Sequence, residues 1–143
     1  MPDSSGGLPQ VAALLVALSL GGLGFLHLVV LPTALLRLPA ESLERLRQSL
    51  LAVFYRVCGG LNLLAALLVS QRVEALWLGL VAVLFAIVDF VLRPQIGFLR
   101  QAGRQGDASA EVPLRRMQRR SLGITMLQTA IGATVFFRLV TIP

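Results

Sequence analysis

The stretch FAIVDFVLRP, residues 85–94, sets one acidic residue, Asp89, into an otherwise unbroken apolar run that ends at Arg93 and Pro94. An ionised carboxylate in such a run normally faces the interior of a helical bundle and has a positively charged partner. We expect Asp89 to pair with Arg56, which lies in the preceding apolar run of the chain. The alternative partner is Arg93, one turn further along the same helix, with Arg56 extending toward the lipid headgroups.

The composition around this stretch is that of an integral membrane protein. Hydrophobic residues make up 56% of the 143 residues, against about 45–50% in soluble domains, and the mean hydropathy is +0.80. A chain of this length has room for one small helical bundle and for no second soluble domain.

Catalytic and metal-binding chemistry has little support in the sequence. His27 is the single histidine and Cys58 the single cysteine. They are too few for a disulfide framework, or for the zinc and di-iron sites that proteins build from three or four side chains. The sequence also lacks a glycine-rich phosphate loop after a strand and a G-x-S-x-G nucleophile motif. We therefore predict a protein that is not an enzyme and has no metal site or cofactor.

Four apolar runs are candidates for membrane-spanning helices. They cover about residues 11–36, 49–69, 75–92 and 121–140. These runs predict an all-α fold, an integral membrane four-helix bundle, as a single domain over residues 1–143. The N-terminus has no basic segment before its first apolar run, which we expect to be a retained span and not a removable signal peptide. Gly21, Gly22 and Gly24 give this first run a small-residue patch for close helix packing.

The distribution of arginine predicts the orientation in the membrane. All 13 basic residues are arginine, and the net charge is +6. Ten of them flank or fill the connections after the first and third apolar runs: Arg37, Arg45, Arg47, Arg93, Arg100, Arg104, Arg115, Arg116, Arg119 and Arg120. The opposite side has only Arg72 and Arg138. The positive-inside rule then makes the arginine-rich side cytoplasmic and puts both termini outside. We expect the plasma (inner) membrane of a prokaryote.

Four of these arginines share one face of a predicted helix that begins near Pro113. Arg115, Arg116, Arg119 and Arg120 are spaced by one, four and five positions, so a helix places them side by side. Such a cluster next to an apolar span suits anionic lipid headgroups, and a solvated face is the alternative. We expect these lipids as partners and no binding of nucleic acid.

The sequence contains a short internal repeat. The segment HLVVLP (residues 27–32) matches DFVLRP (residues 89–94) at an offset of 62, and RQSL (residues 47–50) matches RRSL (residues 119–122) at an offset of 72. We infer two duplicated helical hairpins related by a pseudo-two-fold axis along the membrane normal. In this register His27 is equivalent to Asp89, and Arg56 is equivalent to Gln128.

These four polar residues predict one intramembrane polar layer. His27, Arg56, Asp89 and Gln128 each lie about 4–10 residues from the cytoplasmic end of a predicted span, one residue per span. Polar groups at such depth normally face the bundle interior. We expect His27 and Gln128 to complete the hydrogen bonds around the pair of Asp89 with Arg56.

Several short motifs resemble those of the TMEM205-like (DUF4149) family of small membrane proteins. The motifs are HLVVLP, YRV followed by Asn62, DFVLRPQIGFLRQ and RRMQRRS, within residues 21–132. The resemblance implies a four-span helical bundle whose biochemical role is poorly defined. Two positions depart from the family pattern, since members often have asparagine in place of Asp89 and histidine in place of Gln118. The second departure weakens any proton or metal role inferred from the family.

Three functions are compatible with these features. The first is a non-enzymatic structural or accessory subunit that acts through helix contacts with membrane-protein partners or a second copy of itself. The alternative is a carrier or channel for a small solute or ion that uses the polar layer, as an oligomer because four short helices enclose little volume. A haem or porphyrin protein with His27 as ligand is a further alternative.

Overall fold

The computed structural model describes residues 7–141, and within them every regular element is helical. Four segments are long and apolar enough to cross a membrane: Gly7–Arg37, Ala40–Leu68, Arg72–Arg104 and Ala108–Thr141. This confirms the predicted all-α, four-helix architecture of an integral membrane protein. Residues 1–6, on which the expectation of a retained first span partly rests, lie outside the described part of the chain.

Two of the four segments are built from an α-helix, a π-helical turn and a second α-helix. The first segment consists of α1 (Gly7–Phe25), a first π turn (Leu26–Val30) and α2 (Leu31–Arg37). The third consists of α4 (Arg72–Ile87), a second π turn (Val88–Leu92) and α5 (Arg93–Arg104). The other two segments are α3 (Ala40–Leu68), and α6 (Glu111–Thr141) preceded by a short 3-10 turn (Ala108–Ala110).

The π turns explain how two prolines fit inside long helices. Proline has no amide hydrogen, and its ring collides with the carbonyl four residues before it. Before Pro32 the amide of Leu31 bonds to the carbonyl of Leu26, five residues back. Before Pro94 the amide of Arg93 bonds to the carbonyl of Val88 in the same way. The wider turn accommodates each proline, and the helix continues.

The helices extend further than the apolar runs predicted. The segment 93–120 is helical except around residues 105–107, because α5 continues the third segment and α6 begins at Glu111. At the turn, Gly106 adopts a φ of 92°, a conformation that glycine accepts at little cost. Asp107 begins the next turn by accepting a hydrogen bond from the Ser109 amide at 2.9 Å. Its hydrogen bonds with Ser109 lower the pKa of the Asp107 carboxyl.

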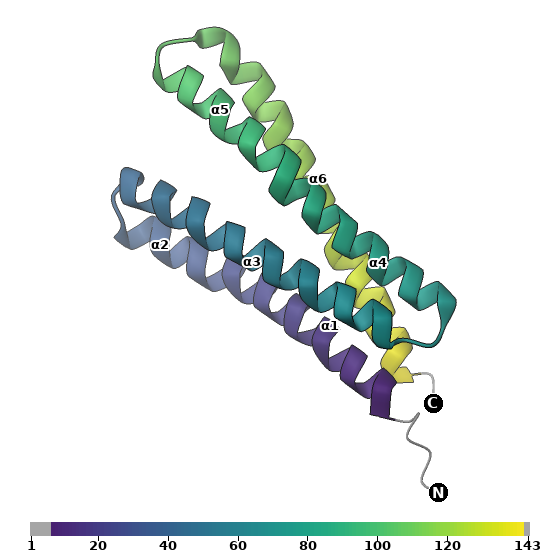
Figure 1. Ribbon diagram of the computed structural model, residues 1–143. Helices are drawn as coiled ribbons and strands as arrows, with labels where there is room; N and C mark the ends of the chain where they lie inside the picture. The colour runs from purple at the N-terminus through teal and green to yellow at the C-terminus, as the bar shows by residue number, and fades with distance from the viewer. Residues whose placement is uncertain (1–6, 142–143) are drawn as a thin grey trace, which may run out of the picture.

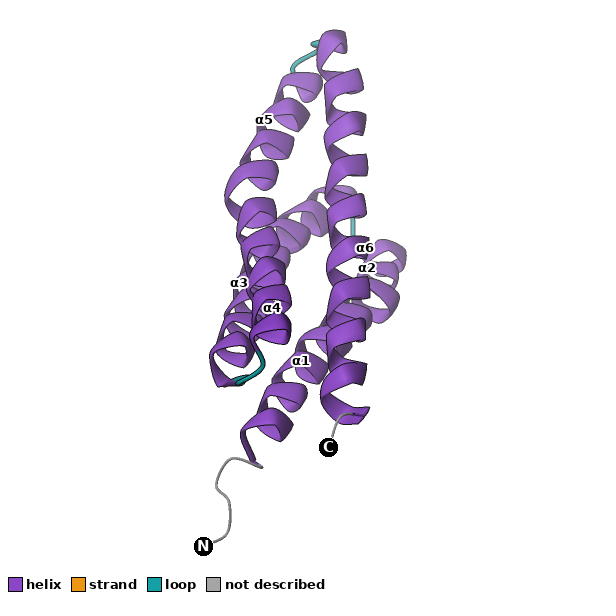
Figure 2. Ribbon diagram, turned by 90° about the vertical axis from the view of Figure 1, so that its right-hand side faces the viewer, coloured by secondary structure: helices purple, strands orange, loops and turns teal. Residues whose placement is uncertain are grey.

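The four segments form two hairpins that meet at one end and separate at the other (Figure 1). The first turn of α1 and the last turn of α6 lie at the closed end, and the α2–α3 and α5–α6 turns lie at the open end (Figures 1 and 2). We call the pair of α2 with the start of α3 the first arm, and the pair of α5 with the start of α6 the second arm. No Cα atom of α2 lies within 8 Å of α5 or α6.

Two apolar clusters stabilise the half of the bundle in which the two hairpins meet, which we call the closed half. One contains Val16, Ala65 and Leu78 with their neighbours, and the other contains Tyr55 and Phe85 with theirs. Small residues allow the helices to approach closely. A Cβ atom added at Gly59 would lie 3.3 Å from the Cβ atom of Phe85, and one at Gly132 would lie 3.1 Å from Leu20.

The predicted glycine patch of the first span is only partly used. A Cβ atom at Gly22 would lie 2.9 Å from the ring of Phe54, so α3 packs closely there. Gly21 and Gly24 have no atom within 4 Å of such a position. The close approach therefore depends on Gly22, because the other two glycines point to a different side of α1.

Candidate functional site

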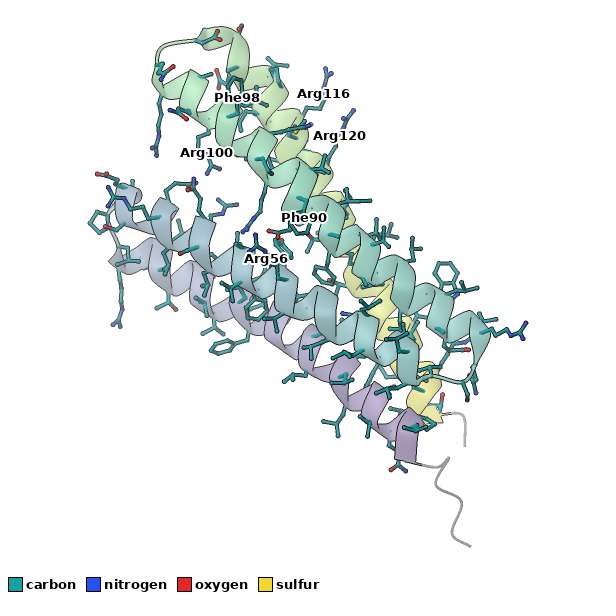
Figure 3. The ribbon with its side chains drawn as sticks, viewed as in Figure 1. Arg56, Phe90, Phe98, Arg100, Arg116 and Arg120 are labelled. Atoms are coloured by element: carbon teal, nitrogen blue, oxygen red, sulfur yellow. The ribbon has the colours of Figure 1, made fainter. Side chains whose placement is uncertain are left out.

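A cleft of about 520 Å³ lies between the two arms and reaches into the membrane-spanning part of the bundle. The first arm and first π turn contribute Leu31, His27 and one face of α3, and the second arm contributes the facing sides of α5 and α6. The lining residues include His27, Leu31, Glu44, Arg47, Gln48, Leu51, Tyr55, Arg56, Val88, Asp89, Arg93, Arg100, Gln118, Ser121 and Thr125. Figure 3 shows Arg56 and Arg100 at the space between the arms.

The charges that line the cleft do not balance. Four arginines face two carboxylates, which leaves an excess of two positive charges. The arginines are Arg47, Arg56, Arg93 and Arg100, and the carboxylates are Glu44 and Asp89. Because low-dielectric walls focus the field of such charges, the cleft attracts anions.

Asp89 binds two arginines at once at the floor of the cleft. Its Oδ2 atom accepts a hydrogen bond from Arg56 Nε at 2.8 Å, across from α3. Its Oδ1 atom accepts one from Arg93 Nη1 at 3.0 Å, one turn along the chain. The two partners considered for Asp89 are therefore compatible, because each takes a different oxygen of a side chain that is 3% exposed.

The two arginines that hold Asp89 differ in their surroundings. The side chain of Arg56 is 64% exposed and its guanidinium lies 5.7 Å from the ring centre of Phe90. Arg93 is only 20% exposed and its guanidinium lies 5.5 Å from the ring centre of Tyr55. Within residues 7–141 the Nη2 atom of Arg93 is buried without a hydrogen-bond acceptor. A buried guanidinium donor of this kind is costly unless an acceptor reaches it.

A second ion pair joins the arms near the mouth of the cleft. Arg100 of α5 donates to Glu44 of α3. Arg47, one turn further along α3 from Glu44, lines the same cleft and makes no ion pair in the described part of the chain. Arg47 therefore has its whole guanidinium available to a ligand, and Arg56, which binds Asp89 only through Nε and is 64% exposed, has its terminal nitrogens available. Arg93 has one further donor, Nη2, which is buried and unpaired among the described residues.

The predicted polar layer forms only in part. His27 Nδ1 lies 2.9 Å from the backbone oxygen of Leu23 on its own helix, and His27 makes no bond to Asp89. Gln128 is 1% exposed, and neither its amide oxygen nor its amide nitrogen has a partner within residues 7–141. The expectation that His27 and Gln128 complete the hydrogen bonds around Asp89 is wrong, because His27 bonds to the Leu23 carbonyl and Gln128 makes no hydrogen bond in the described part of the chain.

The predicted lipid-facing arginines lie outside the cleft. Arg115, Arg116, Arg119 and Arg120 are exposed and line a shallow hollow on α6 together with Val112. Arg115 pairs with Glu111 at 2.6 Å on the same helix. Figure 3 shows Arg116 and Arg120 pointing away from the space between the arms. The helix brings all four together as the spacing predicted, and none of them lines the cleft.

Other buried polar groups stabilise the closed half of the bundle. Asn62 donates hydrogen bonds to Ser19 Oγ and to the carbonyl of Cys58, each at 2.8 Å, and so joins α3 to α1. Glu74 accepts a hydrogen bond from Arg138 at 3.4 Å near the ends of α4 and α6. Within residues 7–141 no three His, Cys, Asp or Glu side chains gather where they could hold a metal ion.

The mouth of the cleft is not among the sites predicted from the sequence, because Arg47 and Arg100 indicate only the orientation there and Glu44 carries no prediction. A signal was present, because Glu44, Arg47, Gln48, Leu51 and Tyr55 recur at helical spacing and all line the cleft. Their mixed polarity conceals the pattern, since a cleft-facing side of a helix carries both polar and apolar residues.

Comparison with known proteins adds no assignment. No family model, no curated protein and no solved structure matches the chain. The resemblance to the TMEM205-like family therefore stays a prediction, and the function has to be inferred from the geometry of the cleft.

Proposed function

We propose that the protein is a non-enzymatic membrane protein that takes an anionic group into the cleft between its arms, as a small carrier or binding component. One observation carries this proposal: the cleft of about 520 Å³ holds four arginines against two carboxylates. A phosphate or carboxylate group matches this excess charge, since both pair with guanidinium groups through short, charge-assisted hydrogen bonds.

The depth of the cleft supports binding in preference to a purely structural role. His27 and Asp89 line it, and both lie within segments apolar enough to span a membrane. Polar groups at that depth are stable only when they face one another, water or a polar ligand. An open, charged cleft at that depth is expected of a protein that binds a polar ligand. It is not expected of a subunit that only packs against neighbouring helices.

An unpaired arginine and an unpaired donor atom of a second arginine, both in the described part of the chain, indicate how an anion would be held. Arg47 reaches the cleft without a carboxylate partner, and Arg93 Nη2 is a buried donor without an acceptor. An oxyanion that enters beside Arg47 would bind Arg93 Nη2 once the side chains that bury this donor move aside, while Asp89 keeps its two existing bonds. The four exposed arginines of α6 belong to the same arm as one wall of the cleft. Such a cluster contacts anionic headgroups, so anions gather near the cleft.

Thermal unfolding tests the proposal and distinguishes the two sources of the anion. Ligands that bind only the folded state raise its stability by mass action. Inorganic phosphate is added to the protein in an uncharged detergent, and in parallel the protein is placed in nanodiscs of phosphatidylglycerol or of phosphatidylcholine. Stabilisation by phosphate indicates a soluble anion, and stabilisation by phosphatidylglycerol alone indicates a lipid headgroup.

Matched arginine variants make this test specific for the cleft. Arg47→Gln should reduce the stabilisation, and it leaves no carboxylate unpaired. Arg116→Gln removes the same charge from the outer face of α6 and should preserve the stabilisation by inorganic phosphate. Equal responses in the two variants, or no stabilisation by either source, would contradict the proposal. Co-purification of a stoichiometric membrane partner with no anion effect would instead favour the accessory role.

A haem site is a second candidate, favoured by one observation. The Nδ1 atom of His27 faces the carbonyl of Leu23, so its proton lies there and the Nε2 lone pair is free in a residue that lines the cleft. Axial histidines in haem proteins are commonly held in this manner. An absorbance spectrum of the purified protein decides this, because a haem protein shows a Soret band.

A further inference from the structure

The structure supports the internal repeat and shows that its halves are not in the same state. The first π turn, Leu26–Val30, and the second, Val88–Leu92, are 62 positions apart, the offset found in the sequence. Pro32 and Pro94 follow them at equivalent positions. Each half is therefore a helix with a π turn and a proline, followed by a second long helix.

The second π turn forms an ion pair with the opposite hairpin, whereas the first π turn makes no such link within residues 7–141. Asp89 binds Arg56, which joins the second π turn to α3. The repeat predicts an equivalent contact of His27 with Gln128, which would join the first π turn to α6. No Cα atom of the first π turn lies within 8 Å of α6. The cleft occupies the place where this contact is missing, between His27 and Thr125.

The packing of the helices places His27 and Gln128 at the same height along the bundle, as it does Asp89 and Arg56. Leu20 of α1 lies against Gly132 of α6, and the carbonyl of Ala82 of α4 lies 3.9 Å from a Cβ position at Gly59 of α3. Leu20 and Ala82 are equivalent in the repeat, and Gly132 is one residue from the equivalent of Gly59. An approach of α6 toward the first π turn would thus bring Gln128 to His27 as Arg56 meets Asp89.

The free atoms of the two side chains are complementary. A carbonyl only accepts hydrogen bonds, so the contact of His27 Nδ1 with the Leu23 oxygen puts the ring proton on Nδ1 and leaves Nε2 as an acceptor. Gln128 is 1% exposed, and its amide nitrogen has no acceptor in the described part of the chain. A buried amide of this kind normally has a partner.

We propose that the cleft closes by an approach of α6 to the first π turn, and that a hydrogen bond from Gln128 Nε2 to His27 Nε2 holds the closed state. The closed state reproduces, in the first half of the repeat, the link that Asp89 and Arg56 make in the second. The inference rests on the proposed function in one respect: an anion bound between Arg47 and Arg93 is enclosed by closure and therefore favours it.

A cysteine pair that lines the cleft reports closure while both proposed partners stay in place. Leu31→Cys and Thr125→Cys are introduced together in a Cys58→Ala background, and disulfide formation is followed as the loss of thiols that react with a polyethylene glycol maleimide, in the monomer band of gels that separate monomer from dimer. In the open structure no Cα atom of α2 lies within 8 Å of α6, beyond the roughly 4.4–6.8 Å that a disulfide spans. An intramolecular crosslink therefore requires closure.

The expected result is a crosslink whose rate depends on Gln128. Gln128→Leu keeps the volume and removes an unpaired buried amide, so the variant should fold, but crosslinking should slow about three- to tenfold, the population change expected for the loss of one hydrogen bond. Leu31→Cys with Met126→Cys is the control, because Met126 is 65% exposed and does not line the cleft. Absence of the crosslink, or an equal rate in Gln128→Leu, would overturn the inference.

Adding the anion separates this inference from the proposed function. Inorganic phosphate should speed the crosslink in the protein that retains Arg47, and should not do so after Arg47→Gln. A crosslink that depends on Gln128 but not on phosphate supports closure and counts against anion binding. Binding of phosphate without any crosslink supports the proposed function and rejects closure.

Discussion

Asp89 is the residue on which the floor of the cleft depends. Its carboxylate is 3% exposed and binds Arg56 at 2.8 Å and Arg93 at 3.0 Å. Loss of the carboxylate leaves both arginines without a partner, whereas loss of one arginine leaves the other pair intact. Among substitutions at Asp89, Arg56 and Arg93, the removal of the Asp89 charge should therefore lower the stability most.

Single substitutions should follow this order. Asp89→Asn should lower the free energy of unfolding in mild detergent by about 3–5 kcal/mol, the range for breaking a buried pair. Arg56→Gln should cost less than about 1 kcal/mol, since its 64% exposed side chain is screened by solvent. Arg93→Gln, at 20% exposure, should fall between them. Chemical or thermal unfolding of the three variants measures the order, and a larger loss in Arg56→Gln than in Asp89→Asn would contradict it.

A double-mutant cycle checks that Asp89 and Arg93 act together. Asp89→Asn combined with Arg93→Gln should recover part of the summed loss, with a coupling of about 0.5–3 kcal/mol. Asp89→Asn combined with Arg116→Gln is the control and should be additive, because Arg116 lies on the outer face of α6. Additivity in both cycles would show that the pair does not stabilise the protein.

The sequence predicts part of this site at the level of single residues. A lone acidic residue in an apolar run is costly, so Asp89 and its two possible partners could be identified before the structure. The choice between the partners could not, because a carboxylate has two oxygens and both arginines are within reach. The lack of contact between His27 and Gln128 depends on the angle between the hairpins, which no local pattern encodes.

At the level of elements, hydropathy predicts the existence of the four helices better than their ends. The apolar runs reflect contact with lipid, whereas helical structure continues through polar residues as far as Arg104 and begins again at Glu111. Pro94 indicated an end of the third span. The π turn before it removes the clash that would stop the helix, and a π turn has no sequence signature of its own.

Two neighbouring glycines of α3 provide a matched test of helix packing. Gly59→Ala should destabilise the protein by about 1–2 kcal/mol, since its Cβ atom would lie 3.3 Å from the Cβ atom of Phe85, close to a rigid backbone. Gly60→Ala should be neutral or stabilising by up to about 1 kcal/mol, because no atom lies within 4 Å and alanine favours the helix. Thermal unfolding in detergent compares them, and equal effects would contradict the packing of α3 on α4.

At the level of the whole molecule, the repeat predicts equivalent residues but not the open shape. The two hairpins meet in the half that carries the apolar clusters and separate in the half that carries most arginines (Figure 1). Their separation creates the cleft. Repulsion among the arginines of the facing arms favours their separation. The ion pair of Arg100 with Glu44 joins the arms and limits how far they separate.

Labelling tests the orientation that the arginine distribution predicts. Ser109→Cys and Ser5→Cys, each in a Cys58→Ala background, should react with a membrane-impermeant maleimide from opposite sides of the membrane. In intact cells Ser5→Cys should be labelled, and Ser109→Cys should be labelled only after permeabilisation. Labelling of both from the same side would contradict the topology and place the mouth of the cleft elsewhere.

The most direct test of the central claim is equilibrium dialysis of radiolabelled inorganic phosphate against the purified protein in an uncharged detergent. Wild type is compared with Arg47→Gln/Arg93→Gln, which removes two of the four arginines of the cleft, and with Arg116→Gln/Arg120→Gln, which removes equal charge from the outer face of α6. The predicted result is saturable binding to wild type. The affinity should fall about tenfold or more in Arg47→Gln/Arg93→Gln and stay unchanged in Arg116→Gln/Arg120→Gln. Equal loss in the two variants, or no saturable binding to wild type when phosphatidylglycerol nanodiscs also fail to stabilise it, would contradict an anion site between the arms.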